Sequence, residues 1–244
     1  MSLKQPGPRG EPIQCFIRRD RTTSTYRLYL GLTPALAGNA SKLLLAAKKV
    51  RKATRTEFLI SLAANEFSRA SNTYIGKLSS NFLGTKFVIY DDQLQNPKCS
   101  FNKGNDGVLQ MVKSKVVNIS YELNFLRTKG PRRMHCTMKE IPNRDEVEQK
   151  DSLVLRNKAP RWHEQLQCWC LNFKGRVTVA SVKNFQLAVD LPCNSQSMEQ
   201  QDDVILQFGK IGKDIFTMDY GYPLSTFQAF AICLSSFDTK PICE

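Results

Sequence analysis

Histidine is rare in this sequence, and the common catalytic motifs are absent from it. Only His135 and His163 occur among the 244 residues, too few to complete a metal shell with the cysteines. His135 adjoins Cys136, but neighbours on a strand point to opposite faces, which separates a nucleophile from its base. No G-x-S-x-G, H-E-x-x-H or paired-carboxylate pattern is present. We therefore predict that the protein is not an enzyme and uses no metal or cofactor.

The chain also begins without an apolar stretch. Met1 to Gly10 is polar and rich in proline and glycine, unlike a signal peptide. We therefore expect a reducing compartment in which the eight cysteines stay as thiols. The most suggestive pair, Cys168 and Cys170, is predicted on a strand, where residues two apart are separated by about 6.5 Å. That separation suits a disulfide poorly, and the spacing is not the C-x-x-C of zinc and redox sites.

Acidic residues are outnumbered: 35 lysines and arginines face 22 acids, which gives a net charge of +13. Such a field favours polyanions, namely nucleic acid, an anionic lipid leaflet or acidic proteins. Charge alone does not choose among them.

Helical periodicity is weak over most of the chain. Short runs of β-branched and aromatic residues alternate instead with turn-forming residues between positions 13 and 218, and we expect strands that include residues 25–32, 43–51, 166–173 and 176–180. Residues 91–106, 143–151 and 192–202 are polar and aperiodic, as loops are. So many strands favour a mainly β sandwich or barrel in one domain.

The C-terminal region breaks the β pattern. No residue from Tyr220 to Phe237 is charged, and apolar residues recur at helical spacing in all directions. Pro223 suits the first turn of a helix. About 14 helical residues would reach only ~21 Å, short of the ~30 Å that a membrane requires. A helix threaded through the middle of a closed barrel accounts for both its apolarity and its length.

The same region carries a resemblance. FTMDYGYPLSTFQAFAICLSSFDTKPICE is similar to the C-terminal signature of Tubby and Tubby-like proteins. SNTYIGKLSSNFLGTKFVIYD, ISYELNFLRTKGPRRMHC, FKGRVTVASVKNFQL and VILQFGKIGKDIFTMDY match further parts in the same order, and QCFIRRD, TPAL and GPRRMHC resemble the plant branch of the family. The matches divide the chain into a short polar segment, 1–12, and a Tubby C-terminal domain, 13–244.

The resemblance implies a closed antiparallel barrel of about twelve strands around a central hydrophobic C-terminal helix. It also implies a non-catalytic module that binds phosphatidylinositol 4,5-bisphosphate and attaches reversibly to the plasma membrane from the cytoplasm. Some members are proposed as nuclear transcription regulators, so DNA binding through the basic surface is the alternative. Plant members usually carry an F-box ahead of this domain. We expect none here, hence no ubiquitin ligase partner, and a monomer.

Five basic residues are the candidate phosphoinositide ligands. If Val50 points into the barrel, alternation sends Lys49 and Arg51 outward together, about 7 Å apart, to straddle two phosphates. Lys48 and Lys52, together with the neighbouring Arg55, raise the local potential, and Lys77 lies in a second matching segment.

Relatives typically carry an arginine of the lipid site where this chain has Ser79. The departure leaves a further alternative, a scaffold that has lost lipid binding. In an unrelated protein the same basic run would be read as a solvated strand end.

Overall fold

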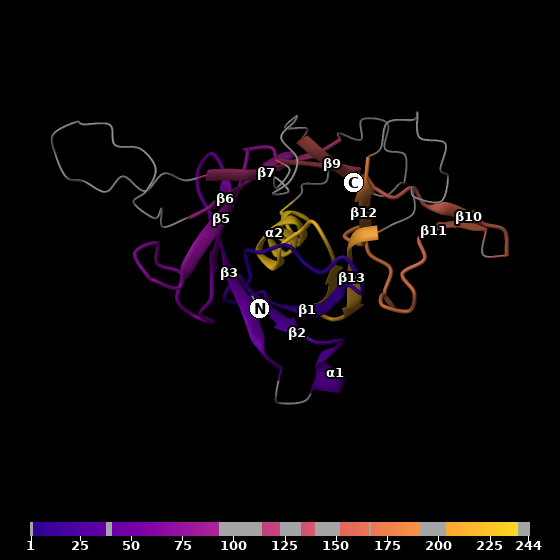
Figure 1. Ribbon diagram of the computed structural model, residues 1–244, viewed down its shortest axis with the longest axis horizontal. Helices are drawn as coiled ribbons and strands as arrows, with labels where there is room; N and C mark the ends of the chain where they lie inside the picture. Colours follow the sequence, from indigo (N-terminus) through magenta and orange to yellow (C-terminus); the bar gives the residue numbers. More distant parts are fainter. Residues whose placement is uncertain are drawn as a thin grey trace.

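The computed structural model describes residues 2–37, 41–92, 114–122, 133–139, 152–165, 167–190 and 204–238. Twelve antiparallel strands form a closed barrel in the order β1-β14-β13-β12-β9-β8-β7-β6-β5-β4-β3-β2. Figure 1 shows helix α2 at the centre of this ring of strands. The mainly β barrel with a central C-terminal helix is therefore confirmed.

Neighbouring strands of the barrel are also neighbours among the barrel strands in chain order, and the first strand pairs with the last. The barrel strands are β1 (Ile13–Asp20), β2 (Thr25–Leu30), β3 (Leu43–Arg51), β4 (Thr56–Ser61), β5 (Tyr74–Ser80), β6 (Lys86–Asp91), β7 (Ser114–Tyr121), β8 (Met134–Lys139), β9 (Ser152–Asn157), β12 (Phe185–Val189), β13 (Val204–Gly212) and β14 (Ile215–Tyr220). The remaining elements are α1 (Pro34–Ala37), the short pair β10 (Arg161–His163) and β11 (Cys168–Cys170), and α2 (Thr226–Ser235).

Helix α2 is shorter than expected and begins after Pro223. Ser225 caps it: its side chain accepts a hydrogen bond from the Gln228 amide at 3.2 Å, and the Gln228 side chain accepts one from the Ser225 amide at 2.9 Å. This capping box satisfies backbone donors that the first turn leaves without partners. Nearly every side chain of α2 is buried, as its all-round apolarity predicts.

Residues before β1 close one end of the barrel. The Phe227 amide donates to the carbonyl of Leu3 at 3.0 Å, and the Gly7 amide donates to that of Leu224 at 2.8 Å. Pro6 pairs with Ser225 as an isolated bridge. The polar segment 1–12 thus contacts the start of α2 directly.

The opposite end of the barrel, where α2 ends, is formed by hairpin turns. Because the strands alternate in direction, the turns 21–24, 52–55, 81–85 and 213–214 all lie at this end, which we call the helix-exit rim. Phe237, just beyond α2, packs there against Tyr26 and Phe216, with ring centroids 4.8 and 4.9 Å away.

Residues 172–179 lie outside the barrel wall rather than within it. Arg176 forms a bidentate ion pair with Asp219 of β14, at 2.8 and 2.5 Å. Val177 lies so close to Gly209 of β13 that a Cβ there would sit 2.3 Å from its Cγ2 atom. The predicted strand at 176–180 is therefore wrong, apart from one bridge between Val179 and Lys210. Most backbone groups of β13 are already paired with β12 and β14, so the segment lies across their outer face and reaches the β13 backbone only at Lys210, beyond the end of the β12 pairing.

Two further expectations concern the cysteines, predicted to be free thiols, and α2, predicted to be too short to span a membrane. Cys15, Cys136 and Cys233 are thiols with no exposed surface in the core. Burial raises the pKa of the Cys15 thiol to about 12. Within the described ranges, no helix has the length and apolarity needed to cross a bilayer. The predicted loops 143–151 and 192–202, and most of 91–106, fall outside those ranges.

Candidate functional site

Lys49 and Arg51 share one face of β3, but that face is the inner one. Lys49 pairs across the strands with Phe58, which is fully buried, and Ala47 of the same face also lies in the core. The expectation that Val50 points inward and sends both cations outward is therefore wrong. Only the exposed Arg51, at the end of the strand, reaches solvent at the helix-exit rim.

The side chain of Lys49 instead closes the barrel at the end of α2. Its Nζ atom lies 2.6 Å from Asp238 Oδ1 and 3.3 Å from the Phe237 carbonyl oxygen, with 12% of the side chain exposed. A cation is favoured there because the carbonyl end of a helix carries partial negative charge. Sequence alternation correctly placed the two residues together, but it could not show which face meets the helix.

The outer faces of β3, β4 and β5 carry the other candidates. Lys48 is exposed, and it pairs across the strands with Leu59, which in turn pairs with Lys77. Beside them lies Glu57, whose side chain is 1% exposed although it stands on the outside of the barrel. Such a carboxylate can be buried only if cations cover it.

Four basic side chains cover Glu57, and together with it they form what we call the Glu57 cluster. The distances to Glu57 Oε2 are 2.7 Å from Lys52 Nζ and 2.8 Å from Arg69 Nη2; those to Oε1 are 2.7 Å from Lys77 Nζ and 3.2 Å from Arg55 Nε. The cluster joins the β3–β4 turn, strands β4 and β5, and the loop that contains Arg69.

The charges of the cluster hold Glu57 ionised. Burial alone would raise the pKa of its carboxyl group, but hydrogen bonds from Lys52 and Lys77 and the charges of Lys77 and Arg69 outweigh burial and lower the pKa to about 2. One carboxylate against four cations leaves a net charge of +3, to which the neighbouring Lys48 adds one more. Lys52, Arg55 and Arg69 remain exposed, so solvent anions can reach them.

Sequence reasoning included Lys48, Lys52 and Lys77 but missed the centre of the cluster. Glu57 directly follows the basic run that ends at Arg55, and an acid at such a position is the signal that could have suggested it. Arg69 carries no sequence signal because its long-range approach depends on the path of the loop after β4. Ser79 stands directly opposite Glu57 in the register of β4 and β5. An arginine at that position would lie beside a carboxylate that already has four cationic partners.

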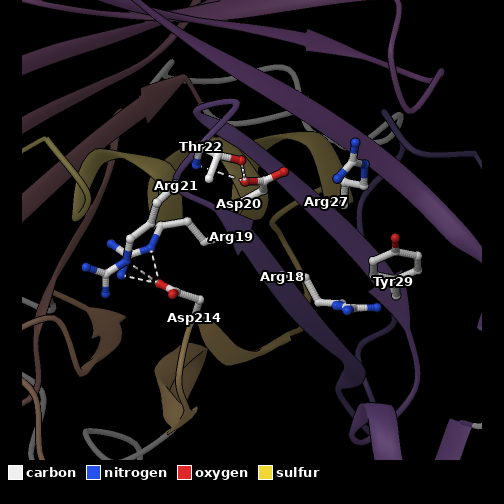
Figure 2. A pocket seen from close by; sticks show the side chains of 8 residues that line it. All are labelled: Arg18, Arg19, Asp20, Arg21, Thr22, Arg27, Tyr29 and Asp214. Carbon is white, nitrogen blue, oxygen red and sulfur yellow. Dashed lines mark hydrogen bonds and ion pairs between the residues drawn. The ribbon is translucent and has the colours of Figure 1, made fainter.

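A second basic group lines a pocket of about 510 Å³ that is formed by β1, β2 and the rim turns that contain Arg21 and Asp214. Figure 2 shows Arg19 and Arg21 gathered on Asp214, while Arg18 and Arg27 lie on the other side of the pocket near Tyr29. Arg19 Nε and Arg21 Nε donate to Asp214 Oδ1 at 2.7 and 2.8 Å. Arg18 and Arg27 are direct cross-strand neighbours, and Arg27 donates to Asn65 Oδ1 at 2.9 Å.

We expect Arg18→Thr to stabilise the protein by about 0.5 kcal/mol at low salt, because like charges directly opposite each other on two strands repel. Urea unfolding at low and high ionic strength measures the effect, which should shrink at high salt as the repulsion is screened. Lys42→Thr removes one exposed charge at the other end of the barrel and serves as the control. A gain that persists at high salt would contradict the electrostatic origin.

Among the described residues, the side chains that could act as a nucleophile and its base, or as metal ligands, do not lie together. Cys136 lies in the core, whereas the His135 ring lies on the outside, 2.8 Å from Glu122 Oε1. This confirms that the two neighbours face opposite ways. No group of three or more His, Cys, Asp or Glu side chains converges within the parts of the chain that the structure describes.

Comparison with known proteins gives a consistent result. The model of the Tub family matches residues 3–239. Tubby-like F-box protein 6 of Arabidopsis thaliana is 55% identical over 290 aligned residues, covering 100% of this chain and 69% of the relative. Tubby-like F-box protein 2 of the same plant is 54% identical, and Tubby-like F-box protein 5 of Oryza sativa subsp. japonica is 52% identical, with 73% and 71% of those relatives covered. A barrel closed around its C-terminal helix, together with these matches, shows that the chain belongs to the Tub family.

Proposed function

We propose that this protein is a phosphoinositide-binding module that attaches reversibly to the cytoplasmic side of the plasma membrane. Its ligand is a headgroup of the phosphatidylinositol 4,5-bisphosphate type. The observation that carries the proposal is the Glu57 cluster: a buried carboxylate that orients four cations, three of them exposed, on one outer patch of the wall. Fixed cations lose little side-chain entropy when a phosphate binds between them.

The roles within the cluster follow from exposure. Lys52, Arg55 and Arg69 are exposed, and each has N–H groups beyond those bonded to Glu57, so these three and Lys48 contact the phosphates. Lys77 is buried between Glu57 and the Tyr90 ring, whose centroid is 5.2 Å from its Nζ atom. It therefore orients Glu57 instead of meeting lipid. Lys49 stabilises the end of α2, and Arg51 adds to the field at the rim.

Vesicle co-sedimentation at physiological salt tests the proposal. Lys52→Gln with Arg55→Gln removes two exposed cations but leaves Lys77 and Arg69 on Glu57, so the fold should persist. Each contact contributes about 1 kcal/mol near an anionic surface, so we expect the double variant to bind bisphosphorylated vesicles roughly 30-fold more weakly. Lys42→Gln with Lys174→Gln removes the same charge at exposed positions outside the cluster and should bind as the wild type does.

Two outcomes would overturn the proposal. One is wild-type binding that follows only the total charge of the vesicle, whichever lipid supplies it. The other is undiminished binding by the Lys52/Arg55 variant. If that variant instead lost affinity for duplex DNA while vesicle binding stayed absent throughout, a nuclear DNA-binding role would replace the proposal.

A further inference from the structure

Two adjacent large apolar side chains are exposed at the helix-exit rim. Phe82 is 65% exposed and Leu83 is 47% exposed, and both lie in the turn between β5 and β6. Two neighbouring apolar side chains on a turn leave a continuous apolar surface in water, and such a surface favours burial in an apolar environment.

The turn presents this pair on an ordered support. Asn81 Oδ1 accepts hydrogen bonds from the amides of Thr85 and Lys86 at 2.9 and 3.1 Å, and its Nδ2 donates to Thr85 Oγ1 at 2.9 Å. Gly84 takes the positive φ of 66° that the turn needs. The position of the apolar pair is therefore set by the hairpin.

The apolar turn lies next to the basic turn of the Glu57 cluster. The Thr56 amide donates to Ser80 Oγ at 3.0 Å, which joins the base of the β3–β4 turn to the end of β5. The exposed cations Arg51, Lys52 and Arg55 stand on this side, and exposed Lys86 follows the apolar turn itself. An apolar tip surrounded by cations matches an anionic bilayer, which offers phosphates at its surface and hydrocarbon beneath.

We propose that the helix-exit rim is the face that meets the membrane, and that Phe82 and Leu83 insert below the lipid headgroups. The spacing supports this orientation. Phe82 lies three positions beyond Ser79, the position opposite Glu57, which corresponds to at most about 10 Å of extended chain. An apolar tip buried by roughly 5–10 Å would thus leave the Glu57 cluster at the level of the headgroups. The inference rests on the proposed function, because it assigns the lipid contacts that accompany headgroup binding.

The experiment compares vesicles with a soluble headgroup. Phe82→Ser with Leu83→Ser should weaken binding to vesicles that contain phosphatidylinositol 4,5-bisphosphate by at least about 10-fold, because apolar burial is lost. Binding of soluble inositol 1,4,5-trisphosphate, measured by calorimetry, should not change. Leu32→Ser with Leu62→Ser is the matched control, since these residues are 40% and 44% exposed at the opposite end of the barrel. Circular dichroism verifies that both variants fold.

A fluorescent reporter gives an independent reading. The emission that Phe82→Trp adds to that of the wild type should shift to shorter wavelength with these vesicles and be quenched by brominated acyl chains. If the serine variant binds vesicles like the wild type, or the emission added by Phe82→Trp is not quenched, the membrane orientation is overturned while headgroup binding stands. If the wild type binds neither the soluble headgroup nor the vesicles, the proposed function itself is overturned.

Discussion

Gly76→Ala should lower the free energy of unfolding by about 3 kcal/mol or more and the thermal midpoint by roughly 6–12 °C. Gly76 lies on the inner face of β5, against Phe227 of α2. A Cβ atom there would sit 2.4 Å from the carbonyl oxygen of Tyr90 and 2.7 Å from Cζ of Phe227. Neither atom can withdraw cheaply, because Tyr90 belongs to the paired strand β6 and Phe227 is buried on α2.

Thermal and urea unfolding, followed by circular dichroism, measure this effect. Gly10→Ala is the control, because a Cβ at Gly10 would meet nothing within 4 Å. An unfolding free energy for Gly76→Ala within about 1 kcal/mol of the wild type would mean that α2 can move away from β5. The tight fit of helix and wall described above would then be wrong.

Glu57→Gln should cost about 2–3 kcal/mol of stability at neutral pH, although the two side chains have the same shape. The substitution leaves four cations around a neutral group, and removing one member of a buried charge network is strongly destabilising. Three of the four cations are exposed, so water compensates part of the loss. Urea unfolding of both proteins at pH 7 gives the difference, with Glu11→Gln as an exposed control.

The pH dependence of this difference gives a sharper test. The pKa of Glu57 is lowered in the folded protein, from an ordinary value of 4.5 to about 2. A lowered carboxyl pKa stabilises the fold fully above the unfolded value, and the contribution is lost as pH falls through the folded value. The gap between the wild type and Glu57→Gln should therefore stay constant above about pH 5 and narrow toward pH 2. A gap that is the same at pH 7 and pH 2.5 would contradict the ion-pair network.

Lys49 shows why the position of a basic residue matters more than its neighbours in the sequence. Its Nζ atom is held by Asp238 at the end of α2, so its loss would first disturb the closure of the barrel. A loss of lipid binding in a Lys49 variant would therefore not identify a phosphate contact unless stability were measured too. Lys52 and Arg55 are better probes because they are exposed and belong to a cluster that retains other cations.

Strand positions were predictable because alternation is a local property. The predicted strand at 43–51 has the bounds of β3, Leu43–Arg51, and the apolar run after Asp219 correctly predicted a helix buried on all sides. The start of α2 was misjudged because Pro223 was placed in the first turn, whereas the reciprocal bonds of Ser225 and Gln228 start the helix at Thr226. The pair β10 and β11 was found only in part, since three-residue strands carry too few positions to show a period.

The sequence by itself determined the fold class, the buried helix and the presence of a basic run near Lys48. Periodicity and composition are local properties, so they can be recognised without knowing which distant residues meet. The tertiary structure alone decided which side of β3 faces α2, and hence that Lys49 stabilises the barrel. It also decided that Arg69, 12 residues beyond Glu57, returns to the same carboxylate. Likewise, it placed the Phe82 turn beside the Glu57 cluster. Each of these three features depends on how distant segments close into a barrel. The contacts that stabilise them join residues far apart in the chain, and no local sequence pattern indicates which residues those are.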